Sequence, residues 1–257
     1  MRILAVGDLI GESGVKRLKE ILPKIKKEEK IDFVITNGEN SAGGMGITEK
    51  NFKDILDAGT NVITMGNHTW GKKDIFKFID SPQLLRPANY PEGVVGKGLG
   101  IYECKNKKIA VMNFIGRVDI NILSENPFIM AKKMVEEIKD KADIILIDFH
   151  AEATAEKIAM GRYLDGEITA LFGTHTHVQT ADEQIFPEGT AYITDIGMTG
   201  PKNSVIGMDI KASIKRFETT LPEKYKLAEG DCIFNAVIFD IDDETNKATD
   251  IKRINIK

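Results

Sequence analysis

Residues 143–150 read DIILIDFH, an apolar run that ends in a polar residue able to bind metal. Apolar and polar residues do not alternate in it, which is typical of a strand that is buried on both faces. The sequence predicts short strands, most of them of this kind, at 2–6, 32–36, 62–64, 109–114, 143–147, 168–172 and 190–194. Such strands need a cover on both sides, so we expect a central sheet packed against helices or against a second sheet.

Amphipathic helices are predicted between these strands. The first places Val15, Leu18, Leu22 and Ile25 on one face. The second follows Thr48 as N-cap, buries Phe52, Ile55 and Leu56, and ends at Gly59. Further helices are predicted at 128–141, 153–164 and 208–217. Strands and helices therefore alternate, which predicts an α/β fold.

The end of the chain breaks this alternation. Cys232–Asp240 and Ala248–Ile256 are predicted as two strands joined by the polar turn 242–246, which would form a closing hairpin. Residues 81–106 have no clear pattern and are expected to be an irregular excursion. Because there is no internal repeat or long linker, we expect a single domain over residues 1–257.

Composition limits the classes of function. The net charge of −4 over 257 residues gives no broad basic surface, which disfavours long nucleic acid as a partner. Residues 1–6 are too short for the apolar segment of a signal peptide, and no apolar run approaches the roughly 18 residues of a membrane span. Cys104 and Cys232 lack CxxC spacing, so we expect buried, inert thiols in a reducing, cytoplasmic environment.

Polar residues able to bind metal follow five of the predicted strands. They include all four histidines of the chain and are Asp8, Glu39, Asn40, Asn67, His68, His150, His175 and His177. Taken singly, each has an ordinary explanation, such as a turn former, a loop residue or a hydrogen-bonded histidine. Taken together they favour a site, since the carboxyl ends of neighbouring strands form the crevice where α/β proteins bind ligands.

The residue types indicate which metals could bind. Imidazole, carboxylate and amide oxygen without thiolate suit Fe, Mn, Co or Zn and exclude a cysteine-based structural zinc site. Leaving His68 aside, seven candidate ligands are too many for one ion. They suffice for two ions roughly 3.5–4 Å apart that share a carboxylate, an arrangement that serves displacement at phosphorus. Against the two negative charges of Asp8 and Glu39, two divalent ions would make a local trap for phosphate.

Other catalytic templates are missing. The chain has no GxSxG nucleophile elbow, no GxxxxGK[ST] phosphate loop and no GxGxxG dinucleotide motif. Gly43, Gly44 and Gly46 fit a loop that passes near the metals.

At these positions the sequence resembles the calcineurin-like metallophosphoesterase superfamily. The matching motifs are Gly7-Asp8, Gly38-Glu39-Asn40, Gly66-Asn67-His68-Thr69, His150 and Gly173-Thr174-His175-Thr176-His177. Two features depart from the superfamily pattern: Asp8 is not followed by the usual x-His, and the bridging acid is Glu39. These departures, together with residues 148–154 and 194–201, look like the bacterial YmdB-type subgroup.

The resemblance implies a sandwich of two sheets flanked by helices, an oligomeric assembly, and a di-iron or di-manganese phosphodiesterase for cyclic nucleotides, 2′,3′-cyclic nucleotides in particular. One ion would take Asp8, Glu39, Asn40 and His177, and the second Glu39, Asn67, His150 and His175. A hydroxide that bridges the ions would attack phosphorus, and His68 would protonate the leaving ribose oxygen.

Two other readings stay open. The chain could be a regulatory protein that senses nucleotide through the metal site and turns over slowly, or a nuclease or protein phosphatase of the same fold. Arg117, Arg162 and Lys202 could steady phosphate or base, but the expected role of each is at the solvated surface.

Overall fold

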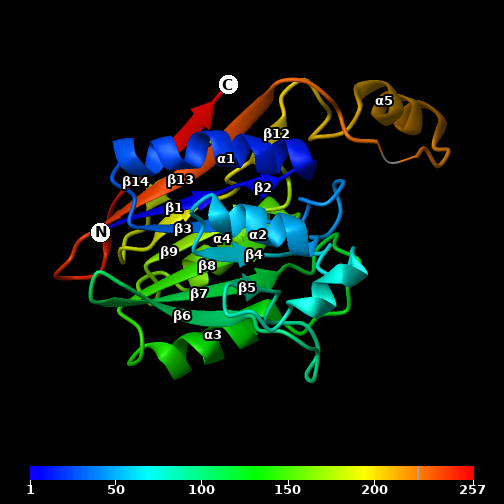
Figure 1. Ribbon diagram of the computed structural model, residues 1–257. Helices are drawn as coiled ribbons and strands as arrows, with labels where there is room; N and C mark the ends of the chain where they lie inside the picture. Colours follow the sequence, from blue (N-terminus) through cyan, green and yellow to red (C-terminus); the bar gives the residue numbers. More distant parts are fainter. Residues whose placement is uncertain (225) are drawn as a thin grey trace.

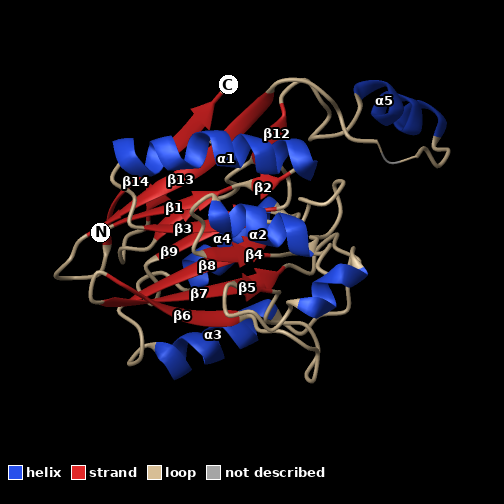
Figure 2. Ribbon diagram, in the orientation of Figure 1, coloured by secondary structure: helices blue, strands red, loops and turns tan. Residues whose placement is uncertain are grey.

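The computed structural model describes residues 1–224 and 226–257 (Figure 1). The helices in this part of the chain are α1 (Gly11–Glu28), α2 (Glu49–Asp57), α3 (Pro127–Ile138), α4 (Thr154–Tyr163) and α5 (Ile210–Thr219), together with the 3-10 helix η1 (Lys73–Lys77). Two sheets make up the centre of the molecule, and helices lie on their outer sides (Figure 2).

The first sheet has the order β2–β12–β13–β1–β3–β4–β5, and β14 pairs with β13. Its strands are β1 (Arg2–Val6), β2 (Asp8–Leu9), β3 (Phe33–Asn37), β4 (Val62–Thr64), β5 (Leu84–Leu85), β12 (Met198–Pro201), β13 (Cys232–Ile241) and β14 (Ala248–Ile256). The neighbours β1, β3, β4 and β5 are parallel, so their carboxyl ends share one edge of the sheet.

The second sheet has the order β10–β11–β9–β8–β7–β6. Its strands are β6 (Leu99–Cys104), β7 (Lys107–Ile115), β8 (Ile144–His150), β9 (Ala170–Thr174), β10 (Gln184–Ile185) and β11 (Ala191–Ile193). Here β7, β8, β9 and β11 are parallel neighbours. Each sheet therefore offers a row of carboxyl ends from which loops can converge on a ligand.

Alternation along the strands builds the cores. In β1, Ile3 and Ala5 belong to the core between the sheets, whereas Leu4 and Val6 pack in the core under α1 and α2. The second sheet alternates in the same way, with α3 and α4 over its outer face. Both faces of the central strands are thus buried, which is the physical reason for their uninterrupted apolar runs.

Most sequence predictions of elements are confirmed within a few residues. All seven predicted strands, the five helices and the closing β13–β14 hairpin form. The Thr48 hydroxyl accepts a hydrogen bond from the amide of Asn51 at 3.3 Å, as expected of an N-cap. Gly59, with φ +109°, follows α2 in a conformation that other residues avoid.

Two predictions need correction. Residues 81–106 are not irregular throughout, because they contain β5 and the edge strand β6, which pairs with β7. Most of β6 is only partly buried and includes Gly100, so it lacks the apolar signal of a central strand. Cys104 and Cys232 are free but half-buried, not fully buried. In the part of the chain that is described, none of the helices combines the length and apolar character needed to cross a bilayer.

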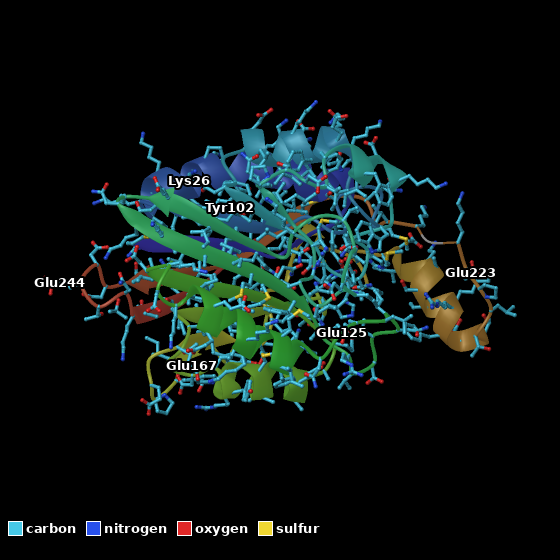
Figure 3. All side chains as sticks on the ribbon, turned by 90° about the horizontal axis from the view of Figure 1, so that it is seen from below. Lys26, Tyr102, Glu125, Glu167, Glu223 and Glu244 are labelled. Atoms are coloured by element: carbon cyan, nitrogen blue, oxygen red, sulfur yellow. The ribbon has the colours of Figure 1, made fainter. Side chains whose placement is uncertain are left out.

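A segment that we call the α5 arm, residues 202–224 and 226–231, leaves the body between β12 and β13. The α5 arm stands away from the sheets in Figure 1, and Figure 3 shows the same from below, with Glu223 on the arm and Glu244 at the opposite end. Every residue of α5 is at least partly exposed, Phe217 by 80%. The arm therefore adds little to the core of the body.

Candidate metal centre

The loops at the carboxyl ends of β1, β3, β4, β8 and β9 bring the predicted ligands together. Asp8, Glu39 and His150 are fully buried, and Asn40 is 2% exposed. Contacts between side chains from both sheets join these positions, as the following groups show. This placement is consistent with the sequence prediction that these residues converge.

The first group is formed by Asn67, His150 and His175. The His150 Nε2 atom lies 2.8 Å from Asn67 Oδ1 and 3.0 Å from His175 Nδ1. It also lies 3.1 Å from Glu39 Oε1. Ligand atoms of Glu39, His150 and His175 all lie within 4.8 Å of one another, close enough to hold one ion.

The second group is formed by Asp8, Asn40 and His177. The His177 Nε2 atom lies 3.2 Å from Asn40 Nδ2 and 3.8 Å from Asp8 Oδ1. Asn40 Nδ2 in turn donates to Glu39 Oε1 at 3.2 Å. The same carboxylate oxygen of Glu39 therefore contacts both groups, and this is the position a bridging ligand would occupy.

His68 lies beside the second group. Its backbone amide donates to Glu39 Oε2 at 2.9 Å, and its Nδ1 lies 2.7 Å from Asn40 Oδ1. The His68 side chain is 28% exposed, whereas that of Glu39 is 1% exposed. His68 can therefore meet a ligand arriving from solvent.

Several observations fit a cation at this centre. Asp8 Oδ1 is buried and has no hydrogen-bond partner among the described residues, although an unpaired buried carboxylate oxygen is costly. Burial lowers the pKa of His150, but Glu39, Asp8 and Asp148 outweigh it and raise that pKa to about 9. The buried carboxylates thus attract positive charge, which metal ions would supply in place of the proton.

Gly66 makes room for the first group. A Cβ at this position would lie 2.4 Å from the His150 ring and 2.5 Å from Glu39 Oε2. The glycine before Asn67 is therefore required for the close approach of the β4 loop to two of the proposed ligands.

Each of the three buried or half-buried imidazoles is oriented through its second nitrogen. His177 Nδ1 donates to the carbonyl of Ile206 at 2.9 Å, which leaves Nε2 free for the centre. His175 Nε2 lies 3.0 Å from Glu152 Oε2, which leaves Nδ1 free for the centre. Hydrogen bonds of this kind to the second nitrogen are usual for metal-binding histidines, since they fix the tautomer and the ring orientation.

His150 is oriented by a buried polar network. The Thr174 hydroxyl donates to Asp148 Oδ1 at 2.7 Å and accepts from His150 Nδ1 at 2.9 Å. Asp148 also accepts from the Thr64 hydroxyl at 2.5 Å. Burial is the main cause that raises the pKa of Asp148, to about 6. Sequence reasoning gave Asp148 no role, although a carboxylate inside an apolar strand must have partners.

The loop between His175 and His177 is strained and firmly held. Both histidines have positive φ, +101° and +65°, in the region that favours glycine. Asp195 Oδ2 accepts from the amide and the hydroxyl of Thr176 at 3.1 and 2.8 Å. The same oxygen pairs with Lys157 Nζ at 2.7 Å, and both side chains are 0% exposed. A buried ion pair thus anchors the residue between two proposed ligands.

We expect Asp195→Ala to lower the free energy of unfolding by about 3–5 kcal/mol, because it leaves the Lys157 ammonium buried without a counter-ion. Urea denaturation at fixed metal concentration measures this. Asp54→Ala is the control, since Asp54 pairs with Lys19 and Lys50 at the surface and should matter little. The double variant Lys157→Met/Asp195→Asn should recover much of the loss. A loss for Asp195→Ala as small as that of the control would contradict the anchoring role.

The three cations considered for phosphate are at the surface, as expected. Arg117, Arg162 and Lys202 are all exposed. The Arg162 guanidinium lies 3.8 Å from the centroid of the Phe186 ring, so it is engaged in packing.

Comparison with known proteins gives consistent similarities. The sequence matches the profile of the YmdB-like protein family over residues 4–254. It is 51% identical over 255 residues to the 2′,3′-cyclic-nucleotide 2′-phosphodiesterase of Bacillus subtilis strain 168, covering 99% of this chain and 96% of the relative.

Solved structures agree. A phosphatase from Mycoplasma pneumoniae, 37% identical, superposes with a TM-score of 0.95 and covers 100% of this chain and 93% of that chain. A hypothetical protein from Thermus thermophilus, 36% identical, gives 0.94 and covers 99% and 98%. The NAD nucleotidase of Haemophilus influenzae, 13% identical, gives 0.57 over 99% of this chain and 55% of that chain, which is a likeness of fold alone.

Proposed function

Because the chain belongs to the YmdB-like protein family, we propose that it is a phosphodiesterase that hydrolyses cyclic nucleotides, 2′,3′-cyclic nucleotides in particular. The similarity to the Bacillus subtilis phosphodiesterase extends over almost the whole of both chains, so it includes every loop of the candidate centre. The single structural observation that carries the proposal is the Glu39 carboxylate oxygen, which contacts two groups of metal-binding side chains at once.

Two transition-metal ions belong to this proposal, iron in the first place and manganese as the alternative. Asp8, Glu39, Asn40 and His177 would hold one ion, and Glu39, Asn67, His150 and His175 the other. Bound ions of this kind lower the pKa of a water nucleophile and neutralise the charge on the phosphate oxygens. The imidazole and oxygen donors fit such metals.

His68 is proposed as the general acid for the leaving ribose oxygen. In the present arrangement Asn40 turns Oδ1 to His68 and Nδ2 to Glu39 and His177. For Asn40 to offer an oxygen to a cation, its side-chain amide must rotate by a half-turn, which exchanges the positions of Oδ1 and Nδ2. A general acid must start as the imidazolium, with a proton on both ring nitrogens, so His68 Nδ1 would then point its proton at Glu39 Oε1, 3.5 Å away, and the Nε2 proton would be available for transfer.

The proposal also includes the cellular location and the oligomeric state of the protein. We place the enzyme in the cytoplasm, which is supported by two cysteines that stay unpaired. A homo-oligomer is expected from the family resemblance, and Phe217 and Leu221, exposed by 80% and 59% near α5, supply apolar surface for it.

The test of the proposed function is substrate preference. We expect 2′,3′-cyclic nucleotides to be hydrolysed faster than the matched 2′- and 3′-monophosphates by metal-loaded protein, with product release followed by chromatography. Protein treated with a chelator serves as the control and should be inactive until metal is restored. Cleavage of monophosphates with inert cyclic nucleotides would overturn the proposal in favour of a phosphatase.

A further inference from the structure

A second cavity lies at the root of the α5 arm. Its volume is about 480 Å³, within the range of small-molecule sites. Residues of α1 form one wall, and both ends of the arm, near 202 and 230–232, form the other. The charged residues around it are Lys16, Arg17, Glu20, Lys202, Asp231 and Lys257. None of the proposed metal ligands lines it.

The charge of this cavity is unusual for the protein. Its four cationic side chains face two carboxylate side chains, an excess of two positive charges that falls to one when the carboxyl group of Lys257 is counted, in a chain whose net charge is −4. A larger cavity, of about 620 Å³, has four lysines balanced by four acidic residues. The excess at the arm root is therefore local, and it favours an anion there.

Arg17 provides the sharper argument. Its Nε atom is buried and makes no hydrogen bond within the described residues. The nearest charged partner is Glu20, whose Oε2 lies 3.6 Å from Arg17 Nη1, beyond normal hydrogen-bond length. A buried N–H without a partner is costly, and a guanidinium is the group best shaped to bind a phosphate with two parallel hydrogen bonds.

We propose that this cavity binds an oligophosphate anion, such as the pyrophosphate group of a nucleotide or inorganic pyrophosphate. Arg17 supplies the directed donors, and Lys16 and Lys202 supply charge from opposite walls. Several phosphate charges are needed to match this many cations, and the volume exceeds what a single phosphate fills. The inference does not depend on the proposed phosphodiesterase activity.

The position gives this site a short path to the metal centre. The amide of Lys202 donates to the carbonyl of Asp231 at 2.8 Å, so the two ends of the arm are joined beside the cavity. Four residues further on, the Ile206 carbonyl accepts from His177 Nδ1. An anion that draws the arm root toward α1 would act on the loop that orients a proposed ligand.

Isothermal titration calorimetry of the metal-loaded full chain with inorganic pyrophosphate tests the site. We expect one equivalent at the arm root, separate from pyrophosphate that binds at the metal centre, with an affinity that falls as salt rises. Lys16→Ala/Lys202→Ala removes two exposed cations and should weaken binding roughly tenfold or more, the scale of losing two charge-assisted contacts. Lys139→Ala/Lys141→Ala, in the balanced cavity, is the matched control and should bind like the parent.

Two further measurements complete the experiment. His150→Ala should still bind pyrophosphate, and metal content is measured after each titration. If binding is absent in the parent, or is lost in His150→Ala but unchanged in Lys16→Ala/Lys202→Ala, the anion site at the arm root is refuted. Titration with ADP distinguishes the two proposed ligands. Tighter binding of ADP than of pyrophosphate indicates that the cavity takes a nucleotide, and equal binding indicates the inorganic anion.

Discussion

Glu39→Ala protein is expected to be depleted of metal at both positions and to cleave 2′,3′-cyclic nucleotides roughly 10³-fold or more slowly than the parent, the scale of losing a dedicated charge-stabilising element. The reason is the double contact of Glu39 Oε1, 3.1 Å from His150 Nε2 and 3.2 Å from Asn40 Nδ2. Removing one carboxylate therefore removes a ligand from each proposed ion. It also takes a negative charge from a buried centre that must attract cations.

Elemental analysis beside the activity assay makes this prediction specific. The parent should hold about two ions per chain. His177→Ala touches only the second group, so it should lose one ion and keep the other, unlike Glu39→Ala. Glu244→Ala, an exposed turn residue, is the control for loss of a glutamate. A fully loaded parent with one ion per chain, or unchanged metal content in Glu39→Ala, would contradict the bridging role.

The candidate ligands could be predicted from sequence because each lies at the end of a strand or within a few residues of it. His150 is the last residue of β8, and Asn67 comes shortly after β4, so the register of the strands carries them to one edge. Local pattern is sufficient for such positions: apolar runs mark the strands, and polar residues at their ends mark the crevice.

The residues that orient the ligands could not be predicted in this way. Asn37 and Asp148, 111 residues apart, form a hydrogen bond that depends on how the two sheets pack. The Lys157–Asp195 pair likewise joins α4 to a loop after β11. No local rule predicts such pairs, although a lysine on the buried face of a helix signals that a partner exists. The sequence did not predict strands such as β2, β6 and β12 for another reason. They are short or exposed, so too few of their residues show the apolar pattern of a buried strand.

His68→Ala should separate catalysis from metal binding. We expect the variant to keep its metals, since the His68 ring contacts Asn40 and Glu39 from beside, not within, the two ligand groups. Turnover of a cyclic nucleotide should fall roughly 10²- to 10⁴-fold, the usual contribution of general acid catalysis. The ribose oxygen leaves as a poorly stabilised alkoxide, so it depends on a proton donor.

The leaving group provides the control for this variant. A nitrophenolate leaves without protonation, so His68→Ala should be impaired much less on bis-p-nitrophenyl phosphate than on a cyclic nucleotide. His150→Ala, which removes a proposed ligand, should fail on both substrates. Elemental analysis and both assays on the same preparations supply the comparison. If His68→Ala loses metal, His68 acts as a ligand; if it keeps metal but slows both substrates equally, it positions phosphate instead, because a proton donor must act through the leaving group.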